Sequence, residues 1–281
     1  MNRSGTPRTG SMRSHSPLAT LMEGVRADVV VRQLAVPFSD LRERVSTACR
    51  PVDAGAVLRG PDGVRVIGEV KRADPARGPL ADVPDPGALA AAYVAGGAAA
   101  VSVVTEQRRH RGAQRDFDAV RATVDVPVML RDFVVTEYQV WEARARRADL
   151  LPLMAAALPG RKLERFLHLA EDIGLTPVVE VHTEEQVTRA LAADARIIAI
   201  DARDPHTLAL DPDAFAKLSA PVPPHVIRIA QSGITTPADA TTLREAGADT
   251  LLVGAALGTS PSPAALVTSL AEVSGAAAGE S

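Results

Sequence analysis

The stretch Val64–Gly78, VRVIGEVKRADPARG, joins an apolar run to residues that could form an acid–base site. Its first half is rich in valine and isoleucine, as expected of a strand that is buried on both faces. Strand alternation places Glu69 and Lys71 on the same side, two residues apart. If that side faces a barrel interior, an acid and an amine project together at the carboxyl end of the strand. The alternative is a strand end that carries a solvated ion pair.

Ionisable and polar residues also follow the other predicted strands. Those positions hold Thr105 and Glu106, Arg131 and Asp132, Glu180 and His182, Asp201 and Arg203, Gln231 and Ser232, and Gly254. In a barrel of parallel strands the active site forms at the carboxyl ends of the strands. Several ionisable groups in one cavity favour acid–base chemistry with perturbed pKa values. We expect Glu180 to be the better-placed base and His182 to cap a helix or support its neighbours.

Two glycine-containing turns point to a phosphate site. Ser232-Gly233 and Gly254-Ala255 follow the seventh and eighth predicted strands. Loops after these two strands, together with a helix N-terminus, commonly bind phosphate in barrels. Either glycine alone would only indicate a tight turn, but the two at the expected positions favour phosphate binding.

The chain alternates between strand and helix patterns from Val64 onward. The predicted strands span residues 64–70, 99–104, 126–130, 150–154, 177–181, 197–200, 226–230 and 250–253, and the predicted helices fall near 86–96, 115–123, 137–147, 162–174, 184–193, 212–218, 237–246 and 263–272. Eight such units predict a (β/α)8 TIM barrel, which typically takes about 250 residues. A doubly wound sheet is excluded because KRADPARG, and not GxGxxG, follows the first strand. Pro152 lies inside the fourth strand, which predicts an early strand end or a bulge there.

The barrel is predicted to carry an N-terminal helical extension. Residues 1–17 lack an apolar period and are expected to be a disordered tail, and residues 274–281 a flexible one. Residues 18–273 form a single predicted domain that includes N-terminal helices within 18–50. The second of these helices spans 38–48 with Ser39 as its expected N-cap, and residues 51–63 are expected to be a connection.

Composition narrows the class of protein. The 281 residues are 46% hydrophobic and 23% charged, with a formal net charge of -3, which is typical of a globular protein that does not bind nucleic acid or anionic membranes. No apolar run reaches the roughly 18 residues that span a bilayer. The one cysteine, Cys49, excludes an intramolecular disulfide, and no HxH, HExxH or CxxC spacing predicts a metal site. We expect a cytoplasmic monomer without metal or cofactor, and without a secretory signal.

Several motifs together resemble the indole-3-glycerol phosphate synthase family. The resemblance covers about Leu18 to Leu270 and includes GVRADVVVRQ, VIGEVKRADPARG, DPGALAAAYVAGGAAAVSVVTE, VPVMLRDFVVTEYQVWEARA, VVEVHTEE, DARDPHTL, IRIAQSGI and LLVGAAL. It implies a lyase of tryptophan biosynthesis acting on a phosphorylated small molecule, 1-(2-carboxyphenylamino)-1-deoxyribulose 5-phosphate. Ring closure onto the sugar carbonyl would expel carbon dioxide and then water.

The resemblance also implies residue roles. Glu69, Lys71 and Glu180 match catalytic positions, with Lys71 binding the substrate carboxylate and the two glutamates moving protons. The family's binding positions are matched by Arg203, Ser232, Gly233 and Gly254. The resemblance implies that Ser232, Gly233 and Gly254 surround the phosphate.

This sequence departs from the family at several positions around the same cavity. The family's general-acid lysine is Arg131, and arginine stays protonated, so it clamps anions but donates protons poorly. The other departures are Asp201 for asparagine, Gln231 for glutamate, Asp74 for a phosphate-contacting serine, His110 for phenylalanine and Ala113 for serine.

Three interpretations therefore stay open at this point. The first is the family's ring closure, with Arg131 tolerated. The second is a divergent paralogue that carries out a related decarboxylation or cyclisation, and the third is a barrel without catalytic activity. We also hypothesise that Arg131 and Asp201 form an ion pair across the barrel mouth.

Overall fold

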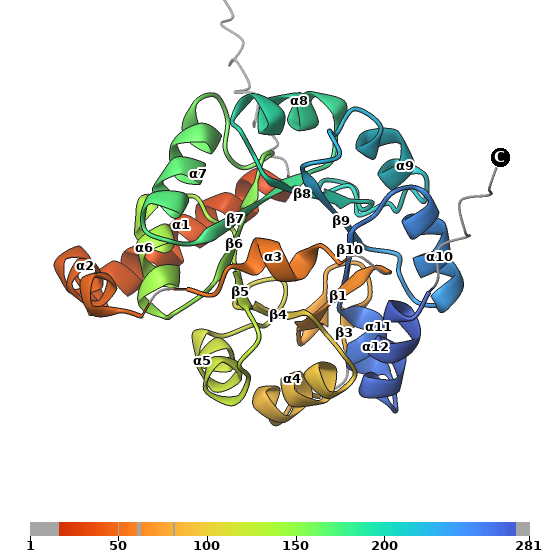
Figure 1. Ribbon diagram of the computed structural model, residues 1–281. Helices are drawn as coiled ribbons and strands as arrows, with labels where there is room; N and C mark the ends of the chain where they lie inside the picture. The colour runs from red at the N-terminus through yellow and green to blue at the C-terminus, as the bar shows by residue number, and fades with distance from the viewer. Residues whose placement is uncertain (1–16, 50, 61–62, 81, 274–281) are drawn as a thin grey trace, which may run out of the picture.

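Eight parallel strands close into a barrel with the helices arranged around it (Figure 1). The computed structural model describes residues 17–49, 51–60, 63–80 and 82–273. The barrel strands are β1 (Arg65–Val70), β4 (Ala100–Val104), β5 (Val128–Arg131), β6 (Leu150–Met154), β7 (Thr176–Val181), β8 (Ile197–Asp201), β9 (Ile227–Gln231) and β10 (Thr250–Val253). They pair in chain order, and β1 closes the barrel against both β4 and β10. The predicted (β/α)8 barrel is confirmed.

Helices follow every barrel strand and bury their apolar faces on its outer surface. They are α4 (Pro86–Ala95), α5 (Gln114–Thr123), α6 (Glu137–Ala145), α7 (Lys162–Asp172), α8 (Glu184–Ala192), α9 (Ala214–Ser219), α10 (Pro237–Glu245), α11 (Ala255–Thr259) and α12 (Pro263–Ala271). The core between strands and helices is mostly valine, leucine and alanine, and its large aromatic members include Tyr93, Phe117, Phe166 and Phe215. The helix after β10 was expected near 263–272, and the short α11 before it was not predicted.

A helix that the sequence did not reveal closes one end of the barrel. Residues 51–63 were expected to be only a connection, but α3 (Ala54–Leu58) lies within them and crosses the barrel end in Figure 1. Ala54 and Leu58 are fully buried against the interior residues Ile67 and Met129. The side chain of Asp53 accepts the amide N–H of Ala56 and so caps this single turn. Five residues are too few to show a helical period, and for this reason the pattern gave no signal.

The N-terminal helices α1 (Pro17–Ala35) and α2 (Phe38–Thr47) pack beside α6 and the loops that follow β5 and β6. Both were predicted, but Ser39 lies inside α2 and is not its cap, because the helix begins after Pro37. The expected tails fall outside the described residues, apart from Pro17, which starts α1. Among the described helices, none combines the length and apolar character that crossing a membrane requires.

Pro152 lies within a continuous strand. β6 pairs with β7 over five residues, with Pro152 opposite Val178, so the strand does not end early. Toward β5 the pairing is limited to Leu150 opposite Met129. A proline lacks the N–H that a ladder needs, which accounts for a weak connection on one side of this strand.

Candidate active site

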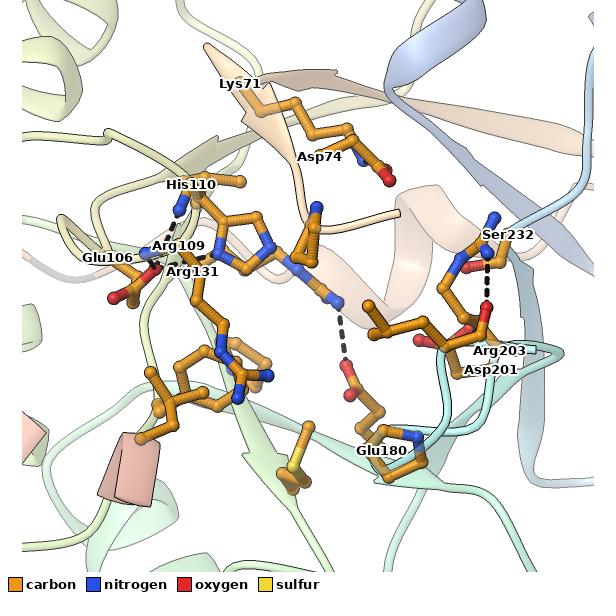
Figure 2. Close-up of a pocket in the computed structure, with 18 of the residues that line it drawn as sticks. Lys71, Asp74, Glu106, Arg109, His110, Arg131, Glu180, Asp201, Arg203 and Ser232 are labelled. Atoms are coloured by element: carbon orange, nitrogen blue, oxygen red, sulfur yellow. Dashed lines mark hydrogen bonds and ion pairs between the residues drawn. The ribbon is translucent and has the colours of Figure 1, made fainter. Parts of the chain in front are cut away.

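The predicted site residues line two adjoining cavities at the carboxyl ends of the barrel strands, and Figure 2 shows the first of them. The larger cavity, the main cleft, is lined by the side chains of Glu69, Lys71, Asp74, Arg131, Glu180, Asp201, Arg203 and Ser232, among others. The smaller cavity, the glycine-turn pocket, adds Gln231, Gly233, Gly254 and Ala255. Parallel strands bring these residues together because their carboxyl ends all meet at the same edge of the barrel.

Glu69 and Lys71 form the ion pair that alternation along β1 predicts. Lys71 Nζ lies 3.4 Å from Glu69 Oε1, and the hydroxyl of Ser102 donates to Glu69 Oε2 at 3.2 Å. Glu69 is buried, and the Lys71 side chain is only 14% exposed. The pair is therefore part of the barrel interior, and the alternative of a solvated pair does not hold.

Arg131 connects the carboxylates of two strands. Its Nη2 donates to Glu180 Oε2 at 2.9 Å, and its Nε lies 3.2 Å from Glu69 Oε2. The Nη1 atom donates to the side-chain oxygen of Gln231 at 3.4 Å. Burial works against the charge of Arg131, but Glu180 and Glu69 raise its pKa overall. The hypothesis of an Arg131–Asp201 ion pair is wrong, because the guanidinium pairs with Glu180 and Glu69 instead.

Glu180 and Asp201 have opposite pKa shifts, although Glu180 is buried and Asp201 is only 13% exposed. Burial favours the neutral form of Glu180, but the adjacent Arg131 and His182 lower its pKa overall. For Asp201, burial and the negative charge of Glu180 raise the pKa. The backbone N–H of Arg203 donates to Asp201 Oδ1 at 2.9 Å, and the side chain of Ser232 also hydrogen-bonds to this carboxylate, but these bonds do not offset the rise in pKa. Two neighbouring carboxylates thus differ in acidity, as acid–base chemistry requires.

Asp74 points back to its own loop and to Lys71. Its Oδ1 accepts the backbone N–H groups of Ala76 and Arg77 at 2.9 and 3.2 Å, and its Oδ2 lies 3.0 Å from Lys71 Nζ. Burial raises the pKa of Asp74, but the neighbouring Lys71 lowers it overall, so the side chain is a carboxylate at neutral pH. This loop contains the short β2 (Ala73–Asp74) and β3 (Gly78–Pro79), a hairpin that the sequence did not predict.

Backbone conformation shapes the glycine-turn pocket. Ser232 and Gly233 both have positive φ, at 69° and 80°, which is unusual for serine and natural for glycine. A non-glycine residue held in this conformation is typical of functional sites. α11 begins directly after Gly254, and the guanidinium-bearing residues Arg77 and Arg203 line the same pocket. Arg77 was not predicted, because it lies within a loop where the sequence shows no period.

Glu106 and His110 also line the main cleft. The sequence placed Glu106 at a strand end and His110 among the departures around the cavity, but it assigned neither of them a role. Glu106 accepts the backbone N–H groups of Arg108, Arg109 and His110 at 2.6, 2.8 and 2.9 Å. His110 Nδ1 lies 2.9 Å from Glu106 Oε2. Burial raises the pKa of Glu106, but these hydrogen bonds lower it overall. The position of Glu106 at a strand end was the available signal, while its role as organiser of the following loop is visible only in three dimensions.

The N-terminal helix α1 contributes to the cleft wall. Leu18 and Leu21 line the main cleft, and Arg32 forms ion pairs with Asp132 at 3.3 Å and Glu142 at 3.1 Å. Asp132 directly follows Arg131, so α1 is held close to the residues that line the cleft. His182, expected to cap or support, lines the cleft as well.

Comparison with known proteins identifies one family. The family model of indole-3-glycerol phosphate synthase matches residues 18–270. An indole-3-glycerol phosphate synthase of Mycobacterium sp. strain KMS is 49% identical over 259 residues, which cover 92% of this chain and 95% of the relative. Indole-3-glycerol phosphate synthase 1 of Streptomyces coelicolor is 48% identical over 255 residues, covering 91% and 94%.

Two solved structures share the fold at low sequence identity. A thiamine phosphate pyrophosphorylase from Pyrococcus furiosus has a TM-score of 0.56 at 18% identity, covering 74% of this chain and 93% of its own. An N-acetylmannosamine-6-phosphate 2-epimerase from Clostridium perfringens has a TM-score of 0.57 at 16% identity, covering 75% and 93%. At these identities the likeness concerns the barrel alone.

Proposed function

The chain belongs to the indole-3-glycerol phosphate synthase family, and we propose that its main cleft performs the family's decarboxylating ring closure. The substrate is 1-(2-carboxyphenylamino)-1-deoxyribulose 5-phosphate, as the resemblance implies. The observation that supports this most strongly is the convergence of Lys71, Glu69 and Glu180 in one cleft at the barrel mouth. Such a group of one amine and two acids suits a reaction that needs charge neutralisation and proton transfer.

Lys71 is the central cation of this proposal. In the reaction a carbon–carbon bond forms between the aromatic ring and the carbonyl carbon, the carbonyl oxygen takes a proton, carbon dioxide leaves, and water is then lost. We assign to Lys71 the substrate carboxylate and the polarisation of the carbonyl, since it is the one lysine among the described residues that line the cleft. An ammonium can release its proton, whereas Arg131 stays protonated and serves as an anion clamp.

Glu180 and Glu69 are assigned the proton movements. Glu180 has a lowered pKa beside Arg131, so it is ionised at neutral pH and has the charge state needed to accept a proton in the final dehydration. Glu69 contacts both Lys71 and Arg131, so it holds the two cations in position and compensates their positive charge. Asp201 and Gln231 stand beside this group, with Gln231 accepting a hydrogen bond from Arg131.

The glycine-turn pocket is proposed to bind the substrate phosphate. Gly233, Gly254 and Ala255 bring backbone close to the pocket, and Arg77 and Arg203 supply positive charge. Ser232 belongs to both cavities, so it lies where the phosphate end and the reacting end of a substrate would meet. Asp74 opposes this assignment electrostatically, since it brings a carboxylate to the same pocket.

A redirected reaction is the second candidate, and one observation favours it. The departures Arg131, Asp201, Gln231 and Asp74 all line the two adjoining cavities, so they act on one site together. A related decarboxylation or cyclisation of another aromatic or sugar phosphate would use the same cations. A non-catalytic barrel is the third, although retention of the buried Glu69–Lys71 pair argues against it. We also propose that the protein is a monomer in the cytoplasm, which size-exclusion chromatography and localisation of a tagged chain would test.

The experiment is a turnover assay on the purified protein. Addition of the substrate to wild type is expected to give the fluorescence of an indole product, and Lys71→Ala is expected to abolish it. Absence of turnover in wild type, with product restored in Arg131→Lys, would favour the redirected enzyme. If neither the substrate nor phosphate raises the melting temperature, the cleft does not bind this class of ligand.

A further inference from the structure

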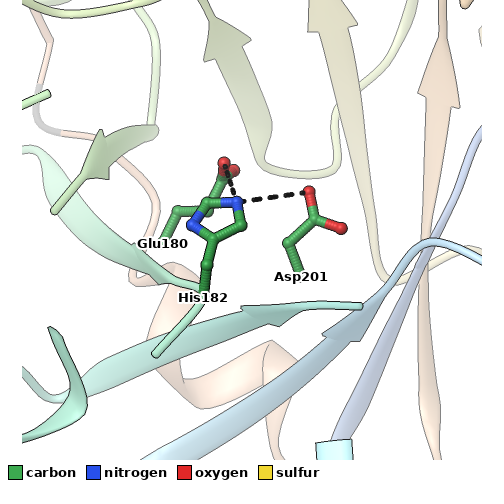
Figure 3. A group of neighbouring side chains, drawn as sticks. All are labelled: Glu180, His182 and Asp201. Carbon is green, nitrogen blue, oxygen red and sulfur yellow. Dashed lines mark ion pairs between the residues drawn. The ribbon is translucent and has the colours of Figure 1, made fainter. Parts of the chain in front are cut away.

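Three side chains at the ends of two neighbouring strands point at one another (Figure 3). Glu180 lies near the end of β7, His182 directly follows that strand, and Asp201 ends β8. The register places Val181 opposite Ile200, so the next residues along the two strands are His182 and Asp201. Their side chains therefore come together because of the barrel itself.

Each carboxylate engages a protein donor through one oxygen and turns the other toward His182. Glu180 holds Arg131 through Oε2, and Asp201 accepts the Arg203 backbone N–H through Oδ1. The second oxygens, Glu180 Oε1 and Asp201 Oδ2, lie 3.7 and 3.8 Å from His182 Nε2. These separations exceed the roughly 3.2 Å of a hydrogen bond, so the imidazole faces two carboxylates without bonding to either.

The His182 imidazole is almost fully buried, and its Nε2 is the ring nitrogen that lies near the two carboxylates. Its side chain is 5% exposed, and the other ring nitrogen, Nδ1, is buried without a hydrogen-bond partner among the described residues. Among the described residues, Arg131 forms an ion pair with Glu180 and not with Asp201. A cation placed between Nε2 and the two facing oxygens would contact all three donor atoms.

We propose that Glu180, His182 and Asp201 bind a divalent transition-metal ion. The three donor atoms lie within 4.8 Å of one another. Ligand distances of 2.0–2.2 Å give tetrahedral donor separations of about 3.4 Å. The two contacts of His182 would therefore contract by a few tenths of an ångström, and the two carboxylate oxygens would approach each other by up to about 1.4 Å. One imidazole with two carboxylates suits Zn²⁺, Co²⁺ or Mn²⁺ better than Mg²⁺, which prefers oxygen ligands alone.

The site opens into the main cleft, because all three residues line it. Three protein ligands leave a coordination position free, as in metal sites that accept water or a substrate oxygen. The sequence did not predict this site, because the common metal motifs are absent. The proposed ligands are a Glu-x-His pair and an aspartate at the end of the next strand. The proposal differs from the expectation of no metal site. Glu180 also takes part in the proposed ring closure, so the test measures metal binding and not turnover.

Titration of chelator-treated protein with Co²⁺ and Zn²⁺ tests the site directly. Calorimetry with Zn²⁺ is expected to show one ion per chain, and Co²⁺ is expected to develop visible absorption bands from nitrogen and oxygen ligands. Asp201→Asn and His182→Gln are each expected to weaken binding by more than about tenfold. His168→Gln, which changes an exposed histidine on α7, is the matched control and is expected to bind as wild type does.

Circular dichroism establishes whether each variant is folded. If His182→Gln misfolds, Asp201→Asn still tests the proposal, because it preserves the size of the side chain. Three results would overturn the proposal. The first is the absence of saturable binding by wild type at millimolar metal. The second is equal affinity in all variants, and the third is binding that survives Asp201→Asn, because the aspartate would then not be a ligand.

Discussion

Arg131 Nη2 lies 2.9 Å from Glu180 Oε2, and this contact ties the third barrel strand along the chain to the fifth across the mouth of the cleft. The same guanidinium also reaches Glu69 at 3.2 Å, so one cation serves two buried carboxylates. An arginine can do this because its planar fork presents several donors at once, which an ammonium group does not. The substitution of lysine by arginine therefore exchanges a proton donor for a fixed positive centre.

Removal of that centre is expected to destabilise the fold. Arg131→Met leaves Glu69 and Glu180 buried with less compensation, and breaking a buried pair in this way typically lowers the free energy of unfolding by about 3 kcal/mol. Arg131→Lys keeps the charge and is expected to lose less than half of that. Urea denaturation at pH 7 measures both. Equal stability of Arg131→Met and wild type would show that the carboxylates do not depend on this cation.

Neutralisation of Asp74 is expected to strengthen phosphate binding. Its carboxylate lines the glycine-turn pocket, and its pKa is lowered by Lys71, so it repels a phosphate dianion at neutral pH. Asp74→Asn removes the charge and releases Lys71 Nζ, and we expect inorganic phosphate to bind about tenfold more tightly. The increase in melting temperature with phosphate concentration measures this affinity. Asp125→Asn, at an exposed loop position, is the control, and unchanged affinity in Asp74→Asn would contradict the assignment of this pocket.

A methyl group at Gly254 is expected to disturb the catalytic pair specifically. A Cβ there would lie 2.8 Å from Glu69 Oε1 and 3.0 Å from Lys71 Cε, so both side chains must shift. Gly254→Ala is expected to lower kcat by about tenfold while the free energy of unfolding falls by only about 1 kcal/mol. Gly258→Ala, in the short helix α11 that follows Gly254, places a Cβ that meets no atom within 4 Å and should match wild type in both measurements. If the kcat of Gly254→Ala equals that of the control, the position of the Glu69–Lys71 pair does not determine the rate of turnover.

Glu106 is expected to make stability depend on pH. Its pKa in the folded protein is lowered overall, although burial opposes this, because His110 and backbone N–H groups bind the carboxylate. A lowered folded pKa contributes stability above the unfolded value of about 4.3, and that contribution is lost as the pH falls through the folded pKa. Glu106→Gln is therefore expected to be less stable than wild type by about 2 kcal/mol at pH 7.

The difference between wild type and Glu106→Gln should shrink as the pH falls below about 4. Thermal unfolding measured from pH 3 to pH 7 follows it, and Glu23→Gln on the exposed side of α1 is the matched control. A difference that is constant over this pH range would mean that the carboxylate charge of Glu106 contributes nothing to stability.

The barrel could be predicted because its strands are short apolar runs separated by amphipathic helices. Glu69 and Lys71 followed from alternation along one strand, which requires no knowledge of distant residues. Pro152 shows the limit of this reasoning, since β6 tolerates the proline by pairing over its full length on one side and at one residue on the other. The single-turn α3 and the two-residue strands β2 and β3 are too short to carry a period.

Partners across the barrel mouth could not be predicted in the same way. The sequence suggested that Arg131 pairs with Asp201, because both differ from the family and have opposite charge. The guanidinium instead reaches Glu180 and Glu69, and Asp201 is turned to His182 and the Arg203 backbone. Which of several carboxylates at one mouth meets a given cation depends on side-chain reach and register.

Turnover of 1-(2-carboxyphenylamino)-1-deoxyribulose 5-phosphate by the purified wild-type protein is the most direct test of the central claim, that this cleft closes the indole ring with arginine at position 131. Product fluorescence is followed in parallel for wild type, Lys71→Ala and Arg131→Lys. We predict turnover by wild type and its loss by at least about a hundredfold in Lys71→Ala. No product from wild type, with product formed by Arg131→Lys, would contradict the claim.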